Sequence, residues 1–430
     1  MTVLVSLGLL FGLLAIGTPV AFAMAFAGSL GLYLVGGGAT LMGILQTTPL
    51  STVSSYELIA IPMFLLMAEF VLVSGIADDL FRAAAAWVGR VPGGLGMATA
   101  LAGAGFGAIC GTSTASAATL SSTSLPAMLR QGYEPRMAAG VVAISGTLAM
   151  LIPPSVALVV FGLLAEVNVG KLLIGGVIPG IIVTIAIMAT VYVLVWRDPS
   201  RAPAPQRVAL VKKVRLLKIV GPMILLLGAV TGVIYMGVAT PTEASAIGSF
   251  GAFLLALARG ALGPRSLLRA LVRASHGTCM IAAILLGASI FGYFFTLTQV
   301  TQDLIAWVGG LPTSRWVIIC LILLGYIVLG SFMDQIAILV LTVPIVVPLI
   351  KSLGYDPLWF GVIKIVTAEV GMITPPIGLN CFVVARYAGR PVSEVFHGTM
   401  PHFLAHLVVI ALFVAVPDLI LWLPGKMMAH

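Results

Sequence analysis

The sequence predicts an all-α polytopic membrane protein built from two inverted repeats, each with one re-entrant helical hairpin. Three observations support this prediction: the apolar composition, an internal repeat with one constant offset, and the one-sided placement of the basic residues. Together they predict two copies of one membrane-embedded unit that face opposite sides of the bilayer.

The composition excludes an ordinary soluble domain. Hydrophobic residues make up 60% of the 430 positions, charged residues make up 8%, and the mean hydropathy is +1.17. Soluble domains carry roughly 25% charged residues, so this chain must bury its apolar surface in lipid. The four cysteines, which show no paired spacing, favour neither a disulfide framework nor a zinc site.

Proline- and glycine-containing motifs recur in the two halves with the same spacing. The pairs, each 222 positions apart, are Pro126 and Pro348, Gly132-Tyr133-Glu134-Pro135 and Gly354-Tyr355-Asp356-Pro357, Pro153-Pro154 and Pro375-Pro376, and Pro179 and Pro401. Repeats of this size are typical of secondary transporters. They define a first repeat at residues 1–200, a basic, proline-rich cytoplasmic linker at 201–215 and a second repeat at 216–430.

Each repeat contains two neighbouring apolar runs that are short for a membrane span. They cover residues 93–129 in the first copy and 316–350 in the second. A span needs about 20 apolar residues, so each pair predicts a re-entrant hairpin. Two full spans would also return the chain to its starting side, and this alternative stays open. A helix broken at Pro153-Pro154 or at Pro375-Pro376 follows each hairpin.

The basic residues predict the orientation. With five net crossings in each half and the linker in the cytoplasm, 17 of the 22 Lys and Arg residues fall on the cytoplasmic side. They are Arg82, Arg90, Arg130, Arg136, Arg197, Arg201, Arg207, Lys212, Lys213, Arg215, Lys218, Arg259, Arg265, Arg269, Arg273, Arg386 and Arg390. Both termini are then periplasmic, and the positive net charge has a topological cause rather than a nucleic-acid partner.

The hairpin tips and the Pro-Pro breaks place polar backbone at membrane depth, where protein or water must satisfy it. Freed carbonyls and hydroxyls suit a hard cation, and helix N-termini suit an anion. We therefore predict one cation site in each copy and an anion cavity between them. The candidate cation ligands are Gly111, Thr112, Ser113, Thr114, Gly146, Ala149 and Ile152 in the first copy, and Gly330, Ser331, Met333, Asp334, Gly371 and Thr374 in the second. The candidate substrate ligands are Ser116, Ser155 and Asn380.

Four charged residues lie within the predicted spans: Glu69, Asp334, Lys364 and Glu369. Intramembrane charge is functional by default, and Asp334 at a hairpin tip is the strongest candidate. Glu69 is equally well explained by an interhelical bond. Lys364 and Glu369 are five residues apart, which is a poor spacing for a pair along one helix.

His402 and His406 have the spacing of a helical metal-binding pair. With Asp418 they permit an alternative function, a membrane-embedded metalloenzyme. No acidic ligand is close in sequence, so we favour an interfacial position for both histidines. The sequence contains no P-loop or dinucleotide fingerprint.

The motifs around the tips and breaks resemble those of the large membrane subunit of tripartite ATP-independent periplasmic (TRAP) transporters. The first copy carries residues 111–116, Ser145-Gly146-Thr147-Leu148, Ile152-Pro153-Pro154-Ser155 and Gly175-Gly176-Val177-Ile178-Pro179-Gly180. The second carries Phe332-Met333-Asp334 and Thr374-Pro375-Pro376-Ile377-Gly378-Leu379-Asn380. Ala149 departs from the pattern, since the family more often has glycine there.

The resemblance implies a non-enzymatic, multi-pass protein of the bacterial inner membrane with an elevator-type fold. It implies sodium-driven uptake of small organic acids, such as C4-dicarboxylates or sialic acid, with sodium as the coupling ion and no cofactor. It also implies two partners, a small membrane subunit of about four helices and a periplasmic substrate-binding protein. A stand-alone carrier that needs no binding protein is the remaining alternative.

Overall fold

The predicted all-α fold class is confirmed. The computed structural model describes residues 1–203 and 209–427, and this part of the chain is helical, without a strand. Nine of its helices are long and apolar enough to cross a membrane. Leu, Ile, Val and Phe side chains cover the outward faces of these helices, as lipid requires.

The first repeat contains the elements up to the cytoplasmic linker. They are α1 (Thr2–Ala15), α2 (Val20–Val53), η1 (Tyr56–Ile59), α3 (Ala60–Val73), α4 (Ile76–Val88), α5 (Gly94–Cys110), α6 (Ser113–Arg130), α7 (Pro135–Thr147), η2 (Leu148–Met150), α8 (Val156–Ala165), α9 (Val169–Gly175), α10 (Val177–Arg197) and η3 (Pro199–Arg201).

The second repeat contains the remaining helices. They are α11 (Leu210–Tyr235), α12 (Pro241–Ala258), α13 (Pro264–Thr298), α14 (Val300–Gly309), α15 (Arg315–Phe332), α16 (Gln335–Ser352), α17 (Pro357–Gly371), α18 (Leu379–Ala388), α19 (Val392–Ala415) and α20 (Asp418–Gly425).

The helix boundaries follow the sequence repeat. The second hairpin arms, α6 and α16, begin at Ser113 and Gln335, which are 222 positions apart. The helices that lead into the breaks, α7 and α17, begin with Pro135 and Pro357, again 222 positions apart. Both predicted hairpins are therefore present as helix–turn–helix units, and both predicted breaks interrupt a helix.

One predicted boundary was wrong. Residues 210–215 belong to α11 rather than to the linker, because no proline follows position 205 until Pro222. Helix α2 continues to Val53, past a kink at Gly37 with a φ of 69°. Helices α19 and α20 are separate, because Pro417 ends the first. The linker residues 204–208, Arg207 among them, lie outside the described part.

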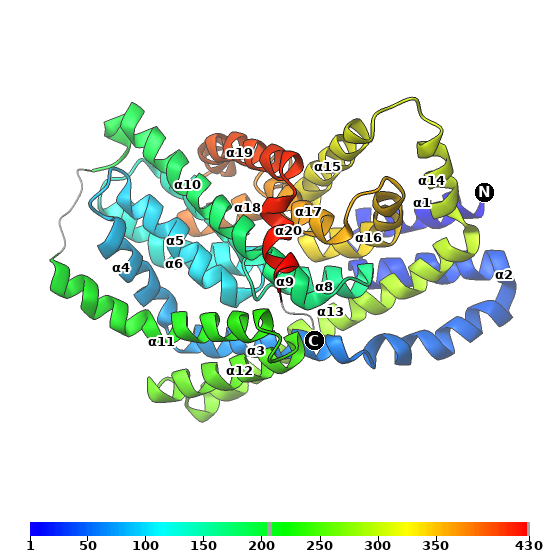
Figure 1. Cartoon of the computed structure of the whole chain (residues 1–430), viewed down its shortest axis with the longest axis horizontal. Helices are drawn as coiled ribbons and strands as arrows, with labels where there is room; N and C mark the ends of the chain where they lie inside the picture. Colours follow the sequence, from blue (N-terminus) through cyan, green and yellow to red (C-terminus); the bar gives the residue numbers. More distant parts are fainter. Residues whose placement is uncertain (204–208, 428–430) are drawn as a thin grey trace.

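The two hairpins lie towards opposite ends of the molecule (Figure 1), α5 and α6 at one end and α15 and α16 at the other. The long helices α2 and α13 pack side by side along one edge. The two half-helices that follow the breaks exchange partners. Helix α8 of the first copy packs on α16 and α17, and α18 of the second copy packs on α6 and α7. The centre of the protein is therefore built from both copies.

Candidate functional site

Each hairpin tip is a short non-helical link between two helices. In the first copy, Gly111 has a φ of 65°, which favours glycine, and Thr112 is extended before α6 begins. In the second copy, Met333 is extended and Asp334 is the N-cap of α16, where its carboxylate accepts a hydrogen bond from the Ile336 N–H at 3.0 Å. Asp334, the strongest charged candidate from the sequence, is thus a helix cap.

The structure brings the hairpin and the break together within each copy. A Cβ atom on Gly107 would lie 2.8 Å from the Ala149 nitrogen, and one on Gly330 would lie 2.9 Å from the Gly371 Cα. Ala149 and Gly371 occupy equivalent positions, 222 residues apart. These backbone contacts confirm neither ligand set, but they place the hairpin against the break in both copies, as a shared cation site requires.

The oxygens of the second break are hydrogen-bonded within the protein in this conformation. The Ser331 carbonyl accepts the N–H groups of Ile377 and Gly378 at 3.2 and 3.1 Å. The Gly371 carbonyl accepts both the N–H and the hydroxyl of Thr374, at 2.9 and 2.7 Å. A cation that bound these oxygens would have to displace the N–H and hydroxyl groups that now donate to them. Binding there would therefore rearrange the tip.

A buried polar cluster joins the first tip to the second copy. The Ser113 hydroxyl donates to Glu369 Oε2 at 2.9 Å and accepts from Asn380 Nδ2 at 2.7 Å. The same Asn380 amide lies 3.4 Å from the Ala143 carbonyl. All three side chains are at most 3% exposed. From the sequence, each of these residues was a candidate by itself. Nothing predicted that they meet, because the equivalent positions of the other copy do not form this contact.

Several buried polar atoms of the hairpins and of the helices next to the breaks have no hydrogen-bond partner among the described residues. Ser116, Ser145, Gln335, Lys364, Glu369 and Asn380 each contribute at least one such atom, although all six side chains are buried. The Lys364 ammonium lies 5.2 Å from the centroid of the Tyr326 ring and interacts electrostatically with Glu369 and Asp334. Buried polar groups normally find partners, so these atoms are candidates to contact water, an ion or substrate.

The three predicted substrate ligands are closed off from solvent in this conformation. Ser116, Ser155 and Asn380 are all 0% exposed. Ser155 is engaged as the N-cap of α8, where it accepts the Leu158 N–H at 3.3 Å. Their role in substrate binding stays a prediction.

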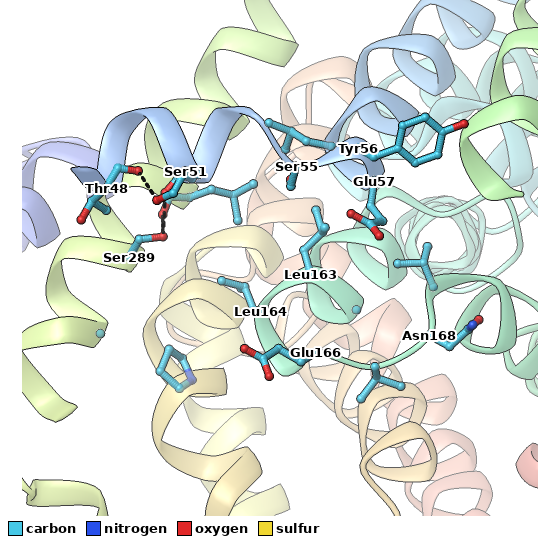
Figure 2. Close-up of a pocket in the computed structure, with 18 of the residues that line it drawn as sticks. Thr48, Ser51, Ser55, Tyr56, Glu57, Leu163, Leu164, Glu166, Asn168 and Ser289 are labelled. Carbon is cyan, nitrogen blue, oxygen red and sulfur yellow. Dashed lines mark hydrogen bonds between the residues drawn. The ribbon is translucent and has the colours of Figure 1, made fainter. Parts of the chain in front are cut away.

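A cavity of about 920 Å³ lies away from the tips, on the side predicted to be periplasmic. It lies between α2, η1, α12 and α13 on one side and α8, α9 and α16 on the other. Figure 2 shows Glu57 from η1 and Glu166 from the turn after α8 at this cavity. Its described lining includes no Lys, Arg or His, so its charge disfavours an anionic substrate.

The histidine prediction was wrong. His402 and His406 are buried within α19 rather than interfacial, because this helix packs on α7, α10, α17 and α18. The described residues contain no group of three or more His, Cys, Asp or Glu side chains placed to hold a metal ion. The Glu69 carboxylate forms an ion pair with the Arg273 guanidinium of α13 at 3.8 Å, but its Oε2 atom has no hydrogen-bond partner among the described residues.

Two copies of a helical hairpin followed by a broken helix, in an apolar shell of spanning helices, define a polytopic membrane transporter of the repeat type. The chain belongs to the family of the DctM component of tripartite ATP-independent periplasmic transporters, whose family model matches residues 7–419. It is accordingly a multi-pass integral membrane transport protein and not an enzyme, and it is a large permease subunit.

Relatives with transport names cover most of the chain. The C4-dicarboxylate TRAP transporter large permease protein DctM of Pseudomonas aeruginosa is 34% identical over 87% of this chain and 87% of its own length. The sialic acid TRAP transporter large permease protein SiaM of Vibrio cholerae is 30% identical over 97% of both chains. The crystal structure of the Alcanivorax borkumensis YdaH transporter shares the fold, with a TM-score of 0.64, 14% identity, and coverage of 93% of this chain and 98% of that one.

Proposed function

We propose that this chain is the large membrane subunit of a sodium-driven importer of small organic acids in the bacterial inner membrane. The observation that supports this most directly is the hairpin–break contact that recurs in both copies, at Gly107 with Ala149 and at Gly330 with Gly371. Sodium gives up its water more readily than magnesium does, so carbonyls and hydroxyls can hold it with few carboxylates.

The substrate class follows from the chemistry that the relatives' names share. They include C4-dicarboxylate, sialic acid, 2,3-diketo-L-gulonate and isethionate transporters, all of which act on small polar anions. A small organic acid of this kind, with C4-dicarboxylates and sialic acid as the leading candidates, is therefore the proposed cargo. We place its site between the hairpin tips rather than in the periplasmic cavity. The described lining of that cavity contains Glu57 and Glu166 but no basic side chain, so it would repel an anion.

The proposed partners are a small membrane subunit and a periplasmic binding protein that delivers the substrate. One relative, the isethionate TRAP transporter permease protein DctMQ of Oleidesulfovibrio alaskensis, is longer, and this chain covers 65% of it. Exposed apolar side chains on α1, α2 and α11 offer surface to lipid or to a membrane partner.

The proposed movement is that of an elevator. The hairpins and broken helices pack into one unit through the exchange of α8 and α18, whereas α2, α3, α12 and α13 pack on one another outside it. The periplasmic cavity lies between these two groups of helices. Spin labels on α2 and α8 should show two distance populations whose ratio changes with sodium and substrate. A single unchanged distance would contradict this movement.

The test of function is uptake into proteoliposomes that hold both membrane subunits, with the binding protein outside. We expect uptake of the organic acid to follow an inward sodium gradient and to fail with potassium. Uptake that ignores sodium and follows a proton gradient would refute sodium coupling. Uptake without the binding protein would favour the stand-alone carrier.

Thr374→Ala tests the second sodium site in the same assay. The hydroxyl contributes only about 1 kcal/mol to folding, so sodium dependence should weaken more than stability does. Thr190→Ala is the matched control, because its hydroxyl also bonds to a carbonyl of its own helix, at 2.8 Å, but lies on α10. An unchanged sodium response in Thr374→Ala would remove this residue from the site.

A further inference from the structure

The Ser113 hydroxyl sits between two side chains from the other copy, Glu369 and Asn380. Each of them has one further polar atom, Glu369 Oε1 and Asn380 Oδ1, that is buried and has no hydrogen-bond partner among the described residues. Because both side chains bond to the same hydroxyl, these two free oxygens lie in one small region at the first hairpin tip. One carboxylate oxygen, one amide oxygen and one hydroxyl are ligands that a hard monovalent cation prefers.

With Glu369, Asp334 and Lys364 all ionised, a bound cation would balance the charges of this region. Glu369 and Asp334 each carry one negative charge when ionised, and the Lys364 ammonium, which interacts with both, carries the single positive charge. Asp334 is further stabilised by the N–H groups at the start of α16. A buried carboxylate without a full counter-charge costs several kcal/mol, so a cation next to Glu369 Oε1 would stabilise the ionised form of this residue.

We propose that Glu369 is the charged ligand of the first cation site, that this site is shared between the two copies, and that Lys364 acts as its internal competing cation. This inference deepens the proposed function and rests on it for the identity of the ion as sodium. A bound sodium ion takes the position next to Glu369 Oε1. The Lys364 charge opposes that ion and so keeps its binding weak enough to reverse during transport.

The two cation sites then differ in the charged side chains that surround them. At the offset of 222 residues, the counterparts of Lys364, Glu369 and Asn380 are Val142, Thr147 and Leu158, none of which is charged. The second site therefore has to rely on carbonyls, hydroxyls and the helix-capping Asp334, while the first carries a carboxylate opposed by an ammonium.

The experiment measures sodium-dependent thermal stabilisation of the purified full-length chain, with choline chloride holding the ionic strength constant. The readout is the sodium concentration that gives half of the maximal stabilisation. We expect Glu369→Gln to raise this concentration at least tenfold and Lys364→Met to lower it several-fold. The control is Glu394→Gln, which removes a partly exposed carboxylate that pairs with Arg390 at 2.9 Å, and it should leave the value unchanged.

The opposite signs separate a binding role from a structural one, because damage to the fold would weaken sodium binding in both variants. If either single variant fails to fold, the double variant Lys364→Met/Glu369→Gln removes both charges together and avoids an unpaired buried charge. It should show the weak sodium response expected of Glu369→Gln, and a response equal to the wild type would overturn the proposal.

A Glu369→Gln value within twofold of the wild type would also overturn it, as would shifts of the same sign in the two single variants. These failures are distinct from failure of the proposed function. Sodium-driven uptake that persists with an unaltered sodium response in Glu369→Gln would leave the function standing and remove only Glu369. Wild-type uptake that ignores sodium would defeat the function itself.

Discussion

Replacing Gly371 by alanine tests the contact between hairpin and break in the second copy. The added Cβ would lie 2.4 Å from the Ile327 carbonyl oxygen and 2.6 Å from the Gly330 Cα. Both atoms belong to the backbone of α15, so no side chain can turn away to make room. Helix α15 would have to move from α17 by about 1 Å to restore ordinary van der Waals contact.

The expected loss of stability follows from the cost of adding an atom to a tightly packed interior. Such insertions destabilise a protein by about 1–3 kcal/mol, and the gain in helix propensity from glycine to alanine returns less than about 1 kcal/mol. We therefore expect Gly371→Ala to lower the free energy of unfolding by about 1–2 kcal/mol and to weaken sodium-dependent uptake, because the tip shifts with α15.

The assay is thermal unfolding in detergent, followed by uptake in proteoliposomes. Gly325→Ala is the matched control on α15, because a Cβ there meets no heavy atom within 4 Å. The control should be as stable as the wild type or slightly more stable. Equal melting temperatures for Gly371→Ala and Gly325→Ala would refute the argument that backbone contact limits this position.

Two further predictions concern topology and packing. Single cysteines at Ser200 and Thr313, both exposed, should react from opposite sides of the membrane in a background without native cysteines, with Ser200 cytoplasmic and Thr313 periplasmic; labelling of Ser200 from outside intact cells would reverse the orientation. Trp359→Phe should lower the free energy of unfolding by about 1–3 kcal/mol, since the buried indole N–H donates to the Phe413 carbonyl at 3.0 Å. Its sodium response should stay normal, and an unchanged melting temperature would show that this bond contributes nothing.

The repeat allowed much of the fold to be predicted from sequence. The offset between Pro153-Pro154 and Pro375-Pro376 located both breaks, because a double proline interrupts a helix wherever it occurs. The same offset relates the starts of α6 and α16. Local backbone chemistry determines these features, so they can be read from short stretches of sequence.

The cross-copy contacts could not be predicted in the same way. Ser113 and Glu369 are 256 positions apart, and Ser113 and Asn380 are 267 apart, so only the folded chain brings them together. The repeat gave no help, because Glu369 is matched by Thr147 and Asn380 by Leu158.

The burial of His402 and His406 was missed for a related reason. Their spacing describes one face of α19, but the helices that cover that face come from both halves of the chain. The lining of the 920 Å³ cavity likewise comes from segments scattered from Thr48 to Pro344.

The exchange of α8 and α18 between the copies also constrains the order of biosynthesis. Helices α6 and α7 leave the ribosome long before α18 is synthesised. Ser113 therefore lacks its partner Asn380, which lies 267 residues later in the chain, during this time. The interior packing of the first half can therefore be completed only after the second half has been synthesised. Nascent chains halted near the linker should therefore be more accessible to proteases and chaperones than the full-length chain.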